Sequence, residues 1–374
     1  MAANPRLWEP GRVKLRLLTG IVALGLVLAA GARAEAAVPQ GFVGIVSDDV
    51  FAHTVAYRDH TLATQAQDGI TLMRMTFDWA LIERRRNHYD FRYYDDAVTT
   101  AAAHGIQILP VLFDPPRFRS SRPRHHASPG TYYPRHLADF GTFAAAVARR
   151  YGPDGTLWGG QSGPGKVPIT AYQLWNEPNL AVYSPPRPSA RRYVALLKAG
   201  SKGIRSVYPG AEIVTAGMPD SKLSRPRLYT FLAQMYKAGA RGAFDTLAIN
   251  PYSRTASGVL RILTRVRQVM HRYHDDGARL WATEMGWSDR GPRSDYRVGA
   301  KAQAQRISQT IAALARARAR LNLRGFIYYS WRDGHPYPPR FKDFWGLHTG
   351  LLRRNGTAKP ALVAFRQAVA ALSR

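Results

Sequence analysis

Short apolar runs alternate with longer amphipathic segments along the chain beyond residue 40. The runs are apolar at nearly every position, which favours strands covered on both faces. The segments between them repeat apolar residues at helical spacing, most clearly at 137–147, 260–270 and 307–321. Eight runs are predicted as strands: Phe42 to Ser47, Thr71 to Thr76, Gln107 to Leu112, Ala171 to Trp175, Glu212 to Gly217, Thr246 to Asn250, Leu280 to Thr283 and Gly325 to Ser330.

This alternation predicts an α/β protein of parallel βα units, and the count favours a single-domain (β/α)8 TIM barrel over residues 37–374. A doubly wound open sheet is the competing fold. It would place a glycine-rich turn after the first strand, and residues 48–53 contain no glycine. A last helix at Ala361 to Leu372 is expected to close the ring by packing on the first strand. The stretch Gly152 to Pro168, rich in glycine and proline, is expected to be a long loop.

The first forty residues have the pattern of an export signal. Basic residues precede an apolar run from Leu17 to Ala30, and the small residues that follow offer cleavage after Ala34 or Ala36. The prediction is a signal peptide over residues 1–36, with an uncleaved membrane anchor as the alternative. No second run is long and apolar enough to cross a bilayer. The rest of the chain is therefore expected to be secreted or held on the extracellular face of the cell envelope.

Composition narrows the choice of chemistry and of partners. The chain contains no cysteine, which excludes disulfides, thiolate metal sites and a cysteine nucleophile. Lysine and arginine number 53 against 25 aspartate and glutamate residues, a formal net charge of +28. The arginines are spread along the whole chain, and no nucleic-acid motif accompanies their short clusters at 84–86 and 117–124. We therefore expect no nucleic-acid partner; the charge favours association with anionic cell-envelope polymers, or an acidic glycan as substrate.

Two glutamates stand where predicted strands end among aromatic residues. Glu177 follows the fourth strand in the segment Trp175–Asn179, and Glu284 ends the seventh strand in the segment Trp281–Trp287. The carboxyl ends of barrel strands form the mouth where active sites lie. A lone glutamate there would more simply be a surface residue or an arginine's partner. A pair suits cleavage of a glycosidic bond, which needs one protonated and one ionised carboxyl group; a separation of roughly 5 Å would mean retention of configuration.

The segments around the two glutamates resemble motifs of a known enzyme family. The segment Trp175–Pro178 and the later Glu284 strand resemble the acid/base and nucleophile motifs of clan A glycoside hydrolases, over a region from about Phe42 to the end. The resemblance implies that Glu177 is the acid/base, that Glu284 is the nucleophile, and that Asn176 hydrogen-bonds the sugar next to the scissile bond. The run from Trp79 to Phe91 and the segment Lys359–Ala361 are most similar to the β-xylosidase-like and cellulase-like families.

The resemblance extends to other strand ends. Arg74, at the end of the second strand, resembles the arginine that keeps the nucleophile ionised. Tyr252 resembles the tyrosine that orients the nucleophile, and Asn250 stands where many members have histidine. Trp331, after the eighth strand, resembles the tryptophan platform for the sugar ring. Trp79 and Asp114 are expected either to line the same cleft or to belong to the core or rim.

The expected activity is hydrolysis of a β-linked oligosaccharide or polysaccharide through a covalent glycosyl-enzyme, by a monomer. No cofactor is expected, and no metal either, because His53, His136 and His335 have no ligand spacing. Two alternatives stay open: a transglycosylase that uses the same residues, and an inactive cell-surface barrel that only binds carbohydrate. The long loops Arg117 to Tyr133 and Gly152 to Pro168 are expected to shape the cleft, and the sugar is left open.

Overall fold

The computed structural model describes residues 38–47, 50, 54–160, 165–336 and 342–373. The predicted signal segment and His53 lie outside the described residues. A compact unit begins at Pro39 and runs to the end of the chain.

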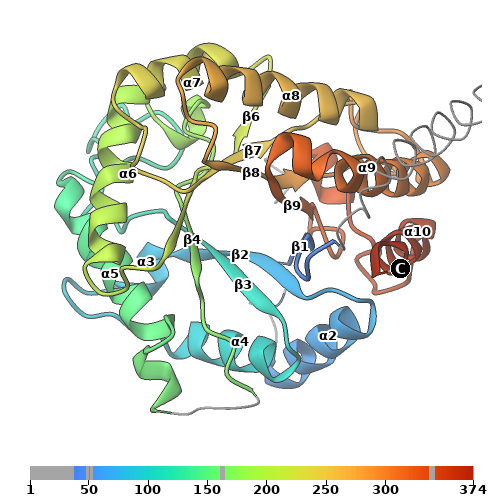
Figure 1. The fold of residues 1–374 in the computed structure, drawn as a ribbon. Coiled ribbons are helices and arrows are strands. Elements are labelled where there is room, and N and C mark those ends of the chain that lie inside the picture. The colour runs from blue at the N-terminus through green and yellow to red at the C-terminus, as the bar shows by residue number, and fades with distance from the viewer. Residues whose placement is uncertain (1–37, 48–49, 51–53, 161–164, 337–341, 374) are drawn as a thin grey trace, which may run out of the picture. The chain divides into compact units, whose positions relative to one another are not determined.

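A closed parallel barrel forms the centre of this unit. The strands pair in the order β5-β4-β3-β2-β1-β9-β8-β7-β6, and a further pairing between β5 and β7 closes the ring. Helices surround the strands (Figure 1). The predicted (β/α)8 barrel is therefore confirmed. The strands are β1 Val43–Val46, β2 Leu72–Asp78, β3 Gln107–Phe113, β4 Ala171–Leu174, β5 Glu212–Thr215, β6 Met218–Pro219, β7 Thr246–Asn250, β8 Arg279–Met285 and β9 Leu323–Tyr328.

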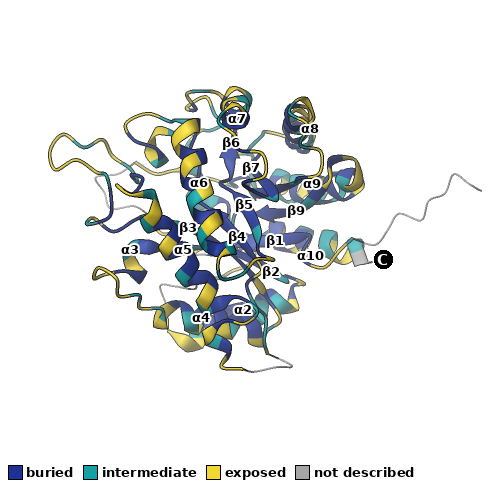
Figure 2. Ribbon diagram, turned by 60° about the vertical axis from the view of Figure 1, so that its left-hand side comes forward, coloured by how far each residue is buried: buried dark blue, intermediate teal, exposed yellow. Residues whose placement is uncertain are grey.

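The helices lie where apolar residues recur at helical spacing, and their apolar sides face the strands. Buried residues are concentrated in the strands and on the inward sides of the helices (Figure 2). In the described residues the α-helices are α2 Val55–Gln67, α3 Trp79–Ile82, α4 Arg92–Ala103, α5 Leu137–Tyr151, α6 Ala190–Arg205, α7 Leu228–Lys237, α8 Ala256–Arg272, α9 Ala300–Leu321 and α10 Pro360–Ala370. None of them is long and apolar enough to cross a membrane.

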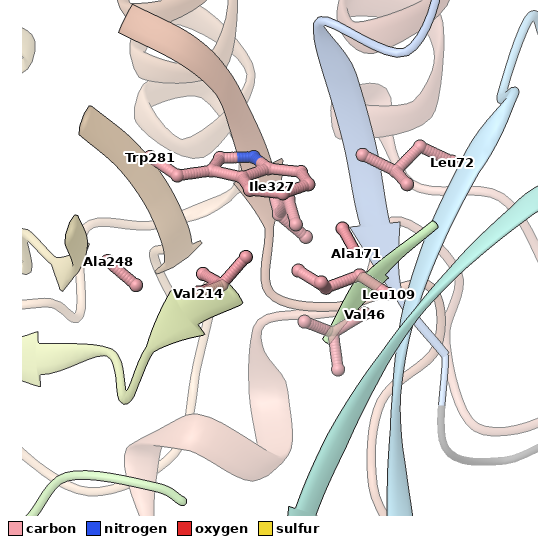
Figure 3. Close-up of a cluster of buried hydrophobic side chains, with 8 residues drawn as sticks. All are labelled: Val46, Leu72, Leu109, Ala171, Val214, Ala248, Trp281 and Ile327. Atoms are coloured by element: carbon pink, nitrogen blue, oxygen red, sulfur yellow. The ribbon is translucent and has the colours of Figure 1, made fainter. Parts of the chain in front are cut away.

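One layer of apolar side chains fills the inside of the barrel. Each of the eight ring-forming strands contributes one buried residue to this layer (Figure 3). A packed layer of this kind makes the barrel interior a core rather than a pore. The members of the layer are Val46, Leu72, Leu109, Ala171, Val214, Ala248, Trp281 and Ile327.

The structure corrects two expectations about the fold. β2 runs on to Asp78, which pairs with Phe113, so Arg74 lies inside the strand and not at its end. The described parts of the predicted loop Gly152 to Pro168, residues 152–160 and 165–168, follow α5 and precede β4, so they lie at the end of the barrel opposite the mouth and do not shape the cleft. The last helix packs on α9, and its Arg366 pairs with Asp68 at the end of α2, 2.6 Å away, so it lies between the helices that flank β9 and β1.

A buried ion cluster holds the loop after β9 in place. The side chain of Lys359 is fully buried, and its Nζ contacts Asp289 at 2.8 Å and Asp333 at 2.7 Å. The same nitrogen donates to the backbone oxygen of His348 at 3.2 Å. One lysine therefore ties together the loops that follow β8 and β9.

Replacing Lys359 with methionine is expected to lower the free energy of unfolding by about 3–5 kcal/mol, because two buried carboxylates lose a shared cation. Urea unfolding measures the change. Lys202→Met, which alters an exposed lysine on α6, is the matched control and should shift it by less than about 0.5 kcal/mol. Equal losses in the two variants would show that the cluster contributes no special stability.

Candidate active site

A polar layer lies directly above the apolar layer, toward the mouth of the barrel. Side chains two positions apart on a strand point to the same face. Arg74, Gln173, Asn250 and Thr283 each follow a member of the apolar layer by two residues, so they too point into the barrel. All four are buried. The alternation that builds the core therefore also delivers polar groups beneath the mouth.

Glu177 lies just beyond the end of β4 and is 9% exposed. Burial, and then the nearby Glu284 carboxylate, raise its pKa to about 8, although Asn250 and Arg74 act in the opposite direction. Both causes penalise the charged form of the carboxyl group. Near neutral pH Glu177 is therefore protonated, as a general acid must be.

Glu284 lies in β8 and has the surroundings of an anion. Arg74 Nη1 contacts its Oε2 at 3.1 Å. The Tyr252 hydroxyl donates to its Oε1 at 2.6 Å. Burial and the Glu284 charge raise the pKa of Tyr252 well above its ordinary value, so its phenol stays a donor. A cation and a phenol thus hold Glu284 from two sides.

Asn250 connects the two glutamates. Its Nδ2 donates to Glu177 Oε1 at 2.9 Å and lies 3.4 Å from Glu284 Oε2. Its Oδ1 accepts from Thr283 Oγ1 at 3.0 Å, which sets the orientation of the amide. Gly217 makes room for that amide, because a Cβ at this position would lie 2.1 Å from Asn250 Oδ1. One amide nitrogen bridges both carboxyl groups, so they lie close together.

Arg74 is the centre of a second set of contacts. Its Nη2 donates to Asn176 Oδ1 at 3.1 Å, and its Nε donates to Gln173 Oε1 at 2.7 Å. Gln173 in turn donates to the backbone oxygen of Thr215 at 3.0 Å. The guanidinium fork is therefore fixed before any ligand binds, and it positions Asn176 beside the glutamates.

The backbone around Glu177 is in an uncommon conformation. Trp175 has φ of 78° and Glu177 has φ of 39°, both in the left-handed region that non-glycine residues rarely occupy. The indole nitrogen of Trp175 donates to the backbone oxygen of Tyr183 at 2.7 Å. Such strain persists where the surroundings over-determine it, commonly at functional sites.

Of the remaining predicted site residues, two are buried in the core. Trp331 is 1% exposed and follows the end of β9 by three residues, so it has no open face on which a ring could stack. Trp79 is fully buried, and its ring stacks on Phe143 with centroids 4.9 Å apart. Trp79 therefore has the core role, one of the two left open for it. The structure does not bring either ring into the mouth.

Asp114 is half-buried just beyond the end of β3. It accepts a hydrogen bond from Thr131 Oγ1 at 3.2 Å, and burial raises its pKa. Burial, and then the charge of Asp114, raise the pKa of Asp78 at the end of β2 to about 6. Thr131 belongs to the loop Arg117 to Tyr133, and its backbone nitrogen also bonds to Val182 in the segment after Glu177. This loop, unlike the Gly152 to Pro168 loop, does reach the carboxyl ends of the strands.

Sequence reasoning missed three aromatic residues near the glutamates or near Tyr252. Tyr183 lies six residues after Glu177, and both glutamates contribute to its raised pKa. Tyr296 and Trp345 come from the loops after β8 and β9, with ring centroids 4.5 Å apart. Both rings contact Tyr252, at 5.5 and 5.3 Å. The only sequence signal for these residues is that they are aromatic and follow barrel strands.

Replacing Trp345 with alanine is expected to raise KM about tenfold with little change in kcat, because a half-buried ring beside Tyr252 is lost as a surface for substrate stacking. Steady-state kinetics on a responsive glycoside measures the split. Tyr93→Ala, which removes an exposed ring on α4, is the control and should leave KM unchanged. A large loss of kcat with unaltered KM would instead point to a role in holding Tyr252.

In the described part of the chain, no group of three or more His, Asp or Glu side chains is arranged to hold a metal ion. The site is instead built from two carboxyl groups, a guanidinium, an amide and a phenol. These groups can donate a proton, supply an ionised nucleophile and orient a polar ligand between them.

Comparison with known proteins gives matches in structure only. No family model and no curated protein matches the sequence. A family 39 glycoside hydrolase from the gut symbiont Bacteroides cellulosilyticus WH2 is similar, with a TM-score of 0.62 and 18% identity over 89% of this chain and 64% of that chain. A monomeric β-xylosidase from Caulobacter crescentus CB15 has a TM-score of 0.64 and 18% identity over 88% of this chain and 68% of that chain. The chain has the fold of these glycoside hydrolases.

The similar structures include enzymes with different names, and this chain covers only part of each of them. An exo-β-1,4-mannosidase from Opitutaceae bacterium strain TAV5 is also similar, with a TM-score of 0.57 and 15% identity, covering 91% of this chain and 60% of that chain. The chain thus spans about two thirds of the length of these structures. The resemblance to clan A barrels is confirmed at the level of the fold, and the differing names of the three enzymes carry no sugar over to this chain.

Proposed function

We propose that this protein is a retaining glycoside hydrolase that cleaves a β-linked glycan by double displacement, with Glu177 as acid/base and Glu284 as nucleophile. The observation that carries the proposal is the Asn250 amide between the two carboxyl groups, 2.9 Å from one and 3.4 Å from the other. Retaining enzymes place their carboxyl groups about 5–5.5 Å apart, whereas inverting enzymes need about 6.5–9.5 Å to admit a water molecule. The bridge favours the retaining spacing.

In the first step, protonated Glu177 gives its proton to the glycosidic oxygen while a Glu284 oxygen attacks the anomeric carbon. The bond between that carbon and the glycosidic oxygen breaks, the leaving group departs as an alcohol, and the sugar is held as an ester of Glu284. Arg74 and Tyr252 orient Glu284 for this attack. Asn176, held by Arg74, is placed to bind a hydroxyl of the sugar.

In the second step, the Glu177 carboxylate takes a proton from water, and the water oxygen attacks the anomeric carbon. The ester bond breaks, Glu284 returns as a carboxylate, and Glu177 is protonated again. The electrostatics favour this exchange of roles. The Glu284 charge is one cause of the high pKa of Glu177, and that charge is absent while Glu284 is esterified. Glu177 therefore becomes a stronger acid after step one and can remain ionised as the base.

The fold similarity to several glycoside hydrolases supports this function, and so do the raised pKa of Glu177 and the contacts of Glu284 with Arg74 and Tyr252. We further propose that residues 1–36 act as an export signal and that the enzyme works outside the cytoplasm, as a monomer, on an oligosaccharide or polysaccharide. The chain has 53 basic and 25 acidic residues, and this positive net charge favours association with anionic polymers of the cell envelope.

A mechanism-based trap tests the proposal. A panel of aryl β-glycosides first finds a sugar that the protein cleaves, and the 2-deoxy-2-fluoro analogue of that sugar is then added. The expected result is slow inactivation, with the mass of one sugar on the peptide that contains Glu284. Proton NMR of the first product should show the β-anomer. Label on another carboxylate, or a first product with inverted configuration, would overturn the mechanism. If adding an acceptor sugar diverts most of the product, the reaction is transglycosylation.

A further inference from the structure

A basic pocket lies on the flank of the barrel, apart from the mouth. It has a volume of about 710 Å³, within the range of about 300–1,000 Å³ that is usual for ligand sites. The loop Glu83–Asp90, the first turn of α4 and the last turns of α5 bound it. Because barrel helices run away from the mouth, the first turn of α4 lies toward the mouth and the last turns of α5 lie toward the opposite end, so the pocket lies along the flank between them. The pocket shares no residue with the site of Glu177 and Glu284.

Five arginines and two aspartates line this flank pocket, so positive charge is in excess. Asp90 pairs with Arg92 at 2.7 Å, and Asp95 pairs with Arg150 at 2.7 Å. Arg84, Arg85 and Arg149 are the other three arginines. All three are exposed, and in the described part of the chain none forms an ion pair within 4.0 Å, although Arg84 is near enough to Asp90 to help Arg92 lower the pKa of that carboxyl group. Three guanidinium groups thus remain available to an anionic ligand.

The loop that carries Arg84 and Arg85 is held from beneath. Glu83 is fully buried and accepts hydrogen bonds from the Trp79 indole at 2.6 Å and from the backbone nitrogen of Asn87 at 2.7 Å. Arg119 forms an ion pair with the same carboxylate at 2.7 Å. The position of the basic loop is therefore set before any ligand binds, which lowers the entropic cost of binding.

Two aromatic rings lie in the pocket beside the arginines. Tyr89 and Phe91 are half-buried and stack with centroids 6.1 Å apart. Guanidinium groups bind carboxylates through two parallel hydrogen bonds, and an aromatic face suits the apolar C–H face of a pyranose ring. A sugar residue that carries a carboxylate offers both features at once. Phosphate groups alone would use the charge but not the rings.

We propose that the flank pocket is a second binding site, for a carboxylated polysaccharide, which holds the enzyme on an acidic glycan while the mouth acts elsewhere. Binding at the flank needs no turnover at the mouth. The site would therefore exist even if the hydrolase mechanism proposed above were wrong, and the two proposals can fail separately.

Affinity electrophoresis of the full chain in gels containing polygalacturonate tests the site. The triple variant Arg84→Gln, Arg85→Gln and Arg149→Gln is expected to bind about tenfold more weakly at low ionic strength, because three charge-assisted contacts are lost. The triple variant Arg272→Gln, Arg316→Gln and Arg320→Gln removes the same charge from exposed positions on α8 and α9. This matched control should bind within about twofold of wild type. All six side chains are exposed, so both variants should keep the wild-type melting temperature.

Three results would overturn the proposal. Equal weakening in both triple variants would mean that binding follows diffuse charge. Undiminished binding to fully methyl-esterified polygalacturonate, which keeps the sugar and loses the charge, would mean that the carboxylate is not recognised. If single-stranded DNA or a polyphosphate binds more tightly than polygalacturonate, and only the triple variant of Arg84, Arg85 and Arg149 weakens that binding, the pocket is a phosphate site. In Glu284→Gln, binding to polygalacturonate should equal that of wild type, because the flank acts without turnover.

Discussion

Replacing Glu284 with alanine is expected to lower kcat on an aryl β-glycoside by on the order of 10⁴-fold or more, because the proposed mechanism forms its covalent intermediate on this carboxylate. The change also leaves a small cavity between Arg74 and Tyr252, the two groups that hold the carboxylate. Azide should enter this cavity and attack the anomeric carbon from the side that Glu284 used. The product is then a glycosyl azide of inverted configuration, and NMR of that product measures the outcome.

The configuration of the azide product separates the two glutamates. In a Glu177→Ala variant azide attacks the glycosyl-enzyme from the opposite side, so the product keeps the configuration of the substrate. Asp154→Ala, which removes one exposed carboxylate from the loop after α5, is a control that should leave kcat unchanged. If azide restores the inverted product in Glu177→Ala instead, the roles of the two glutamates are exchanged. If neither variant loses activity, the reaction takes place elsewhere on the molecule.

The barrel could be predicted from the sequence because strands that are buried on both faces consist of nearly continuous apolar runs. All eight predicted strands overlap observed ones, and the ring closes between β5 and β7. The two-residue strand β6 was missed, since Met218 and Pro219 carry no run for a pattern to detect. Arg74 was placed at the end of a strand predicted over Thr71 to Thr76, whereas the strand itself continues to Asp78.

The candidate site was predictable in so far as it lies on strands. Strand ends bring Glu177 and Glu284 to the mouth, and strand alternation brings Arg74 beneath them. Glu284 directly follows the inward-pointing Thr283, and a register irregularity between Ala282 and Met285 lies at this position. Tyr296 and Trp345 reach the mouth on loops that are held by tertiary contacts such as those of Lys359. No local pattern encodes such contacts. Asn250, read only as a departure from histidine, proves to be the group that bridges the glutamates, which distances alone could reveal.

Glu177→Gln is expected to lower kcat about 10²–10⁴-fold on substrates with a poor leaving group, because the leaving oxygen must then depart without a proton. A substrate with a nitrophenolate leaving group needs little protonation, so its first step should lose far less. Glutamine keeps the size of the side chain and can still contact Asn250. The comparison across a series of leaving groups therefore isolates proton donation from packing, and equal losses across the series would contradict the acid role.

The pH profile gives the same assignment from an independent direction. Burial and the Glu284 charge raise the pKa of Glu177 to about 8, and the group donates only in its protonated form. For a poor leaving group, kcat/KM of the wild-type protein should therefore be high at neutral pH and fall about tenfold per pH unit above about 8. In Glu177→Gln that alkaline fall should disappear, because the titrating group is gone. A fall that persists in the variant would assign the titration to another acid. The Glu284 charge contributes to the raised pKa of Glu177, so the pKa of Glu177 should be lower in Glu284→Gln than in the wild-type protein. An NMR titration of the Glu177 carboxyl group measures this shift without any turnover. An unchanged pKa would mean that the two carboxyl groups do not interact.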